Sequence, residues 1–354
     1  MKRALALARR AKGRTSPNPM VGAVLVKRGR VIAEAYHRKA GTPHAEALAI
    51  ASAGDKAGGA TLYVTLEPCC HTNKRTPPCT EAIMSSGISR VVVAMKDPNP
   101  QVAGKGISML EKAGIAVKGG IMEKEARELN LAYIKHITTG MPFVTLKAAM
   151  TLDGKIATPE GQSKWITGPE ARKIVHKMRS DSDALLSAIG TVKADDPEFT
   201  SRIKGGQSPV RVIIDPELDV PRGSKVLTTP PHTIIVTRAG GEKARELRAM
   251  GVGILQYDNS LDLKWLMGEL GKIGITSVMA EGGSSFNWHC LDEGIVDRVV
   301  FFIAPKLIGG SDSLSSVGGG KSFRRLEDAI KLGKMNTRRV GEDIMITAEV
   351  LNPR

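Results

Sequence analysis

His44-Ala45-Glu46, followed by Pro68-Cys69 and then Cys79, is the stretch that decides the fold of this chain. One imidazole and two thiols can hold a zinc ion and leave its fourth tetrahedral position to water, as catalytic zinc sites do. Zinc bound in this way makes the water a nucleophile near neutral pH. Glu46 is not needed as a ligand and can move a proton, so we expect water to attack an amino-bearing ring carbon here.

The same side chains could hold a structural zinc ion, whose fourth ligand could be Cys70 or His71. A structural site has no use for Glu46, which interrupts an apolar run, and the catalytic interpretation is therefore favoured. Between the two neighbouring cysteines we expect Cys69 to bind, because it directly follows Pro68. That order is typical of a loop entering a helix N-terminus, whose N–H groups favour a thiolate.

Length and composition indicate an ordinary globular enzyme inside the cell. The 354 residues suggest two domains, and 42% hydrophobic with 25% charged residues is typical of soluble proteins. Three of the 4 cysteines are clustered, which indicates metal ligands and not a disulfide framework. The N-terminus lacks a signal-peptide pattern and the apolar runs are too short for a membrane span, so we expect a cytoplasmic protein with no membrane partner.

The formal net charge of +15 could indicate a nucleic-acid-binding protein. The lysines and arginines are spread along the chain, however, and only 4% of the residues are aromatic, so stacking surfaces for single strands are scarce. A protein that binds phosphorylated small molecules carries the same kind of charge. We therefore expect no nucleic-acid partner.

Helical and strand patterns alternate along the chain and predict an α/β fold in two domains. Gly140-Met141-Pro142 is the expected boundary, which places the domains at residues 1–140 and 141–354. In the first domain the patterns predict an N-terminal helix, strands at 21–26, 30–36, 61–66 and 90–95, a helix carrying His44 and Glu46, and helices at 79–86, 107–113 and 122–139. In the second they predict strands at 143–149, 184–189, 210–214, 233–236, 277–280 and 298–303, and a helix at 168–179.

The second half contains a strand–glycine–helix junction at Glu281-Gly282-Gly283-Ser284-Ser285. Small residues at such a junction let backbone N–H groups approach a phosphate. Because no G-x-G-x-x-G occurs in the right context, this half is not an ordinary Rossmann domain. Spacing alone makes it a candidate phosphate or nucleotide binder and nothing more specific.

Longer motifs resemble one family over essentially the whole chain. They are Ser16-Pro17-Asn18-Pro19-Met20-Val21-Gly22, Thr65-Leu66-Glu67-Pro68-Cys69 through Thr76-Pro77-Pro78-Cys79, Asp97-Pro98-Asn99-Pro100, Leu152-Asp153-Gly154-Lys155, Ser163-Lys164-Trp165, Gly190-Thr191 through Asp195-Asp196-Pro197, and Ala304-Pro305-Lys306-Leu307. On these motifs the chain resembles the bifunctional riboflavin-biosynthesis deaminase/reductases. The zinc motif alone fits many deaminases, whereas the long cysteine loop together with the second-half motifs is specific to this family. The loop is one residue longer than the family pattern, and Cys70 stands where serine is commoner.

The resemblance implies a cytidine-deaminase-like α/β/α layered domain followed by a dihydrofolate-reductase-like α/β domain. The first would bind one zinc ion and hydrolyse an amino group of a diamino-phosphoribosylaminopyrimidinone. The second would use NADPH to reduce the ribosyl side chain to ribityl, giving 5-amino-6-(5-phosphoribitylamino)uracil. The expected partner is therefore a phosphorylated pyrimidine, and we also expect a homo-oligomer.

The same resemblance implies roles for individual residues. His44, Cys69 and Cys79 would bind zinc, and Glu46 would be the general acid and base. The residues that would hold the deaminase substrate are Asn18, His37, His71 and Arg75. The cofactor-binding set in the second half is Ala149, Trp165, Thr191, Asp195, Pro216, Gly283, Ser284, Ser285, Phe286, Asn287, Trp288 and His289. The reductase substrate would be held by Lys147, Ser163, Arg179, Phe199, Arg202 and Glu281, of which the arginines suit a phosphate.

Two other classes of protein use some of the same features. One is a nucleic-acid-editing deaminase fused to a basic RNA-binding domain. The scarcity of aromatic and basic clusters, and the motifs around Lys147, Trp165 and Asp195, count against it. The other is a non-catalytic nucleotide-binding protein with a structural zinc ion, which leaves Glu46 without a use.

Overall fold

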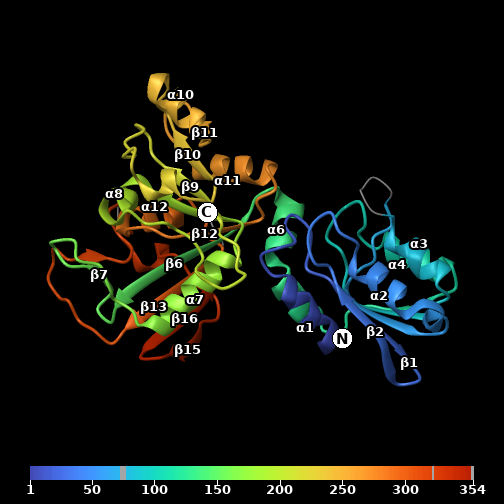
Figure 1. The fold of residues 1–354 in the computed structure, drawn as a ribbon. Helices are drawn as coiled ribbons and strands as arrows, with labels where there is room; N and C mark the ends of the chain where they lie inside the picture. Colours follow the sequence, from blue (N-terminus) through green and yellow to red (C-terminus); the bar gives the residue numbers. More distant parts are fainter. Residues whose placement is uncertain (72–76, 321–322, 352–354) are drawn as a thin grey trace. The chain divides into compact units, whose positions relative to one another are not determined.

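Two compact units make up the chain in a computed structural model that describes residues 1–71, 77–320 and 323–351 (Figure 1). The units are Met1–Met141 and Pro142–Arg354, so the division lies one residue after the expected boundary. Among the described residues, none of the helices combines the length and the apolar character that a membrane span needs.

The first unit is built on one sheet, whose strand order in the described part is β2-β1-β3-β4-β5. β1 is antiparallel to β2 and β3, whereas β3, β4 and β5 are parallel. β3 and β4 are rich in β-branched residues and mostly buried, as expected of strands covered on both faces. The strands are β1 (Gly22–Lys27), β2 (Arg30–Tyr36), β3 (Thr61–Leu66), β4 (Arg90–Met95) and β5 (Ala116–Lys118). The α-helices are α1 (Lys2–Ala8), α2 (Ala45–Ala53), α3 (Cys79–Ser85), α4 (Lys105–Lys112), α5 (Glu123–Leu129) and α6 (Leu131–Thr139).

The single helix expected at 122–139 is wrong, because the structure has two helices that meet at Asn130. The Asn130 amide accepts a hydrogen bond from Met20 N at 2.8 Å and donates one to Met20 O at 3.1 Å. Asparagine side chains that bond backbone groups compete with a continuous helix. The break therefore fastens the loop that carries Asn18 to the start of α6.

The second unit contains a larger sheet with the order β11-β10-β9-β8-β12-β6-β13-β16-β15 among the described residues. The strands from β11 to β13 are parallel, and β16 and β15 add an antiparallel edge. β6 and β13, far apart in sequence, lie side by side (Figure 1). The strands are β6 (Phe143–Thr151), β8 (Ala184–Ala188), β9 (Val210–Ile214), β10 (Thr233–Thr237), β11 (Gly253–Gln256), β12 (Ser277–Ala280), β13 (Arg298–Ala304), β15 (Asn336–Val340) and β16 (Asp343–Glu349), with β7 (Lys155–Ala157) and β14 (Leu314–Ser315) paired separately.

Four neighbouring parallel strands, β9, β8, β12 and β6, end at the same edge of this sheet. Residues that follow such strands gather at that edge, which is where open α/β sheets bind ligands. The helices of the second unit are α7 (Pro169–Ser180), α8 (Ile189–Asp195), α9 (Lys225–Thr228), α10 (Gly241–Ala249), α11 (Leu263–Lys272) and α12 (Ser284–Asp292).

Candidate active sites

The three expected zinc ligands converge in the first unit. His44 Nδ1 lies 3.1 Å from Cys79 Sγ and 3.5 Å from Cys69 Sγ, and all three ligand atoms lie within 4.8 Å of one another. With ordinary zinc–ligand bond lengths, two ligand atoms of a tetrahedral site are about 3.6 Å apart. The donor set therefore fits a zinc ion. The group includes Cys69 and not Cys70, so the geometry favours Cys69 of the two neighbouring cysteines.

Helix termini place two of these ligands. His44 is the N-cap of α2, and Cys79 is the first residue of α3. We expected Cys69 itself to begin a helix, which is wrong, because it lies in the loop after β3. The Cys79 N–H at the start of α3 donates to Cys69 Sγ at 3.4 Å, so a helix N-terminus still favours that thiolate, from a separate segment.

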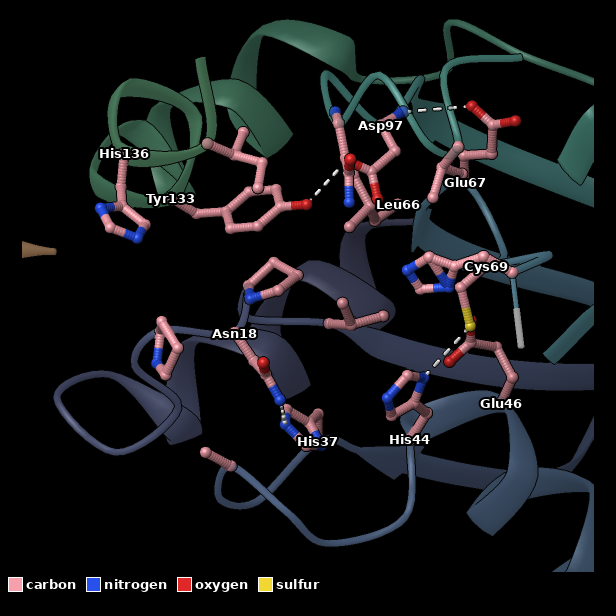
Figure 2. Close-up of a pocket in the computed structure, with 18 of the residues that line it drawn as sticks. Asn18, His37, His44, Glu46, Leu66, Glu67, Cys69, Asp97, Tyr133 and His136 are labelled. Carbon is pink, nitrogen blue, oxygen red and sulfur yellow. Dashed lines mark hydrogen bonds between the residues drawn. The ribbon is translucent and has the colours of Figure 1, made fainter. Parts of the chain in front are cut away.

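Glu46 lies in the first turn of α2, beside the ligand group (Figure 2). Its side chain is only 3% exposed, and its Oε2 atom has no hydrogen-bond partner within the described part of the chain. Burial, reinforced by the Cys69 sulfur, raises the pKa of Glu46. A buried carboxylate oxygen without a partner is costly unless a ligand or water satisfies it, and this one lies against the zinc ligands.

The ligand group opens into a cavity of about 600 Å³, which Asn18, His37 and His71 also line, as expected. His37 Nδ1 is 3.3 Å from the Pro43 carbonyl, which can only accept, so this nitrogen carries the proton. His37 Nε2 then accepts from the Asn18 amide nitrogen at 3.2 Å. Figure 2 shows this hydrogen bond between Asn18 and His37 in the cavity. The remaining expected contact, Arg75, lies outside the described residues.

The far wall of the cavity includes residues that we did not single out from the sequence. Asp97 follows β4, while Tyr133 and His136 come from α6. The Tyr133 hydroxyl donates to Asp97 Oδ1 at 2.8 Å, and burial raises the pKa of both groups. Only the Asp97-Pro98-Asn99-Pro100 motif marked this wall in the sequence, since a tyrosine and a histidine on a helix carry no signal of their own.

In the second unit, Lys147, Arg179 and Glu281 form a buried charge cluster. Lys147 Nζ lies 2.9 Å from one Glu281 oxygen, and Arg179 lies 2.9 Å from the other. Leu146 pairs with Ala280 across β6 and β12, so Lys147, within β6, and Glu281, just after β12, are the next residues of neighbouring strands. Burial alone would raise the pKa of Glu281, but the two cations lower it to about 2.

Several expected reductase residues lie around this edge of the sheet. Ser163 donates to Asp195 at 3.4 Å, and Arg172 stacks 4.6 Å from the centre of the exposed Trp165 ring. Phe199 is buried beneath Arg179, at 5.8 Å. Of the other expected positions, Ala149 lies on β6 and Thr191 on α8. Pro216 follows β9, and Arg202 lies in the loop after α8.

The α12 residues differ in what they can offer a cofactor. Gly283 is the N-cap, and a side chain built there would meet nothing within 4 Å, so the helix N-terminus has open space beside it. Phe286 and Asn287 are buried, and Asn287 donates to Ser316 O at 2.8 Å. The segment 318–320 packs closely on Ser284, Ser285 and Trp288. A side-chain carbon at Gly320, for example, would lie 1.9 Å from Trp288 Nε1. His289, also on α12, stays a predicted contact.

Comparisons with known proteins agree on both units. The family model "Cytidine and deoxycytidylate deaminase zinc-binding region" matches residues 1–95, and "RibD C-terminal domain" matches residues 142–346. The chain is 49% identical to the riboflavin biosynthesis protein RibD of Aquifex aeolicus, over 98% of this chain and 96% of that protein. It is 40% identical to RibD of Escherichia coli, over 98% and 97%.

Solved structures give the same result. RibD of Acinetobacter baumannii matches with a TM-score of 0.91 and 38% identity, covering 99% of this chain and 98% of that one. A diaminohydroxyphosphoribosylaminopyrimidine deaminase/5-amino-6-(5-phosphoribosylamino)uracil reductase of Thermotoga maritima matches with a TM-score of 0.90 and 38% identity, covering 99% and 97%. The chain therefore belongs to the RibD family of riboflavin biosynthesis, a bifunctional enzyme with a zinc-dependent deaminase domain followed by a reductase domain.

Proposed function

We propose that His44, Cys69 and Cys79 hold the zinc ion and that Glu46 is the catalytic residue of the deaminase. The substrate is a diamino-phosphoribosylaminopyrimidinone, whose amino group leaves as ammonia. The observation that carries this proposal is the buried Glu46 Oε2, which has no hydrogen-bond partner among the described residues and lies beside three converging zinc-type donors in a cavity. Bound zinc supplies the Lewis acid that makes water nucleophilic at neutral pH.

The remaining chemistry belongs to the side chains of the cavity. Glu46 takes a proton at its carboxylate and returns it to the leaving nitrogen, which is the role of a general acid and base. The Asn18 oxygen accepts from the pyrimidine, because its amide nitrogen is used by His37. Asp97, held by Tyr133, forms the opposite wall.

In the second unit we propose that the deaminated product is reduced at its ribosyl group. NADPH, when bound, supplies the hydride. The N-terminus of α12, with open space at Gly283, accepts its pyrophosphate. Lys147, fixed by Glu281, offers a charged donor to the sugar, and Arg202 binds the phosphate. Arg202→Ala should raise the KM for the pyrimidine more than the KM for NADPH.

Glu46→Gln tests the deaminase assignment. The variant keeps the size of the side chain and leaves the ligands untouched, so it should still bind one zinc ion. It cannot exchange a proton, which should lower ammonia release by about 10²–10⁴-fold. Glu111→Gln, on the exposed face of α4, is the matched control and should keep full activity. Normal ammonia release from Glu46→Gln would contradict the assignment.

The two activities should also be separable. Glu46→Gln should reduce the already deaminated intermediate at the wild-type rate, because the reductase residues all lie in the other unit. Cytoplasmic location and a homo-oligomer stay predictions, and light scattering of the purified protein checks the second.

A further inference from the structure

Glu67, which directly precedes Pro68-Cys69, is a buried carboxylate that the deamination chemistry does not use. It is 2% exposed, and its backbone N–H continues the sheet by donating to Met95 O at 3.0 Å. Its carboxylate points away from Glu46 and toward the backbone of Asp97 (Figure 2). A buried carboxylate needs several donors, because desolvating a charge is costly.

Three backbone N–H groups satisfy that carboxylate. Gly104 and Asp97 donate to Oε2 at 2.9 and 3.2 Å, and Ile107 donates to Oε1 at 3.1 Å. Two of these donors belong to the N-terminus of α4, whose N-cap is Gly104 and which has no acidic residue in its first turn, all of it described. Glu67 therefore caps α4 from a distant strand, and its charge is favourable at that helix end.

The first turn of α4 also packs directly on the residue before the zinc ligand. A side-chain carbon at Gly106 would lie 2.1 Å from the Pro68 carbonyl oxygen and 3.2 Å from Glu67 Oε1. On the other side, Thr80 N donates to Cys69 O at 3.2 Å. The backbone around Cys69 is thus clamped between the N-terminal turns of α3 and α4.

We propose that Glu67 is a positioning residue for Cys69: by capping α4 it fixes Pro68 and Cys69 where the thiolate meets His44 and Cys79. This inference rests on the zinc ligands proposed above. Both carboxylate oxygens are occupied by backbone donors, so Glu67 is not a second general base. Through Asp97 N it also fixes the substrate wall relative to the zinc ligands.

Glu67→Gln tests the inference, because an amide of equal size offers one acceptor oxygen where the carboxylate offers two. Zinc affinity, measured by competition with a chromogenic chelator, should fall on the order of tenfold to a hundredfold. In the cobalt-substituted protein, the thiolate-to-metal absorption should change. Far-UV circular dichroism should match wild type, which shows that the unit carrying Glu67 is folded, and reductase activity should be unchanged because its residues lie in the other unit. Glu293→Gln is the matched control, because Glu293 caps α11 through Leu263 N at 2.8 Å in the other unit, and it should leave both metal readouts unchanged.

Two further measurements keep the inference open to refutation. Gly106→Ala keeps the Glu67 carboxylate but presses on the Pro68 carbonyl and on Glu67 Oε1, so it should weaken zinc binding in the same way. In wild-type protein the Gly104 and Ile107 amides should be protected from hydrogen exchange. Wild-type zinc affinity and cobalt spectrum in folded Glu67→Gln, or rapid exchange of both amides, would overturn the inference. If Cys69→Ser bound zinc as tightly as wild type, the ligand set itself would be wrong, and both proposals would fail together.

Discussion

Replacing Glu281 by glutamine should destabilise the second unit in a pH-dependent way. Glu281 is 16% exposed and pairs with Lys147 and Arg179, which are 11% and 15% exposed. Its pKa falls from 4.5 to about 2, and each pKa unit corresponds to about 1.36 kcal/mol. The ionised form of Glu281 is therefore stabilised in the folded state by about 3 kcal/mol. The cost of breaking a buried ion pair is similar, about 3–5 kcal/mol.

The sign of the pH dependence follows from the direction of the shift. The folded-state pKa of Glu281 lies below the unfolded-state value, so the stabilisation is complete above about pH 4.5 and is lost as the pH falls toward about 2. At pH 7 the free energy of unfolding of Glu281→Gln should therefore be about 3 kcal/mol lower than that of wild type. At pH 3 roughly half of that difference should remain.

Urea unfolding followed by tryptophan fluorescence measures this directly, because all 3 tryptophans lie in the second unit. Glu198→Gln is the control. Because its partner Arg202 is 63% exposed, the free energy of unfolding should fall by less than about 1 kcal/mol. The reasoning would be refuted if Glu281→Gln lowered the free energy of unfolding by the same amount at pH 7 and pH 3, or by no more than the control variant does.

Three other variants test separate features. Gly283→Val fills open space beside α12, so it should raise the KM for NADPH on the order of tenfold or more while ammonia release stays normal in the same preparation. Tyr133→Phe removes the hydrogen bond to Asp97. The loss should lower the free energy of unfolding of the first unit by about 1–2 kcal/mol and raise the KM of the deaminase for its substrate. If both quantities are unchanged, the role of this wall is contradicted. Cys70→Ser should keep the full zinc content by metal analysis, and loss of zinc there would show that the wrong cysteine has been assigned.

Local sequence signals predicted the central strands well and picked out the three side chains that converge as candidate zinc ligands. β3 and β4 begin and end at the expected residues, because buried β-branched runs leave little choice of structure or boundary. The proposed metal ligands lie in short motifs, and the structure brings their ligand atoms close together. The reductase residues depended on the family resemblance, since a lone lysine or arginine carries no signal of its own.

Features that depend on distant partners were not predictable in this way. The break at Asn130 exists because its side chain bonds Met20, a residue far away in the sequence. The α6 wall of the cavity has the same origin. β15 is exposed along most of its length, and β16 lacks a regular alternation, so neither strand has the pattern that a buried face produces.

The two walls of the deaminase cavity come from different parts of the chain, which affects how the enzyme can change in evolution. The proposed zinc ligands and Glu46 lie within residues 1–95, the part that the broad deaminase model matches. Asp97, Tyr133 and His136, on the opposite wall, all come from the stretch between that part and the reductase unit. The proposed reaction chemistry therefore lies in the earlier segment, while the cavity is lined by residues of both segments. Substitutions in the later segment can change the shape and polarity of this wall while the sequence of the proposed metal ligands stays unchanged.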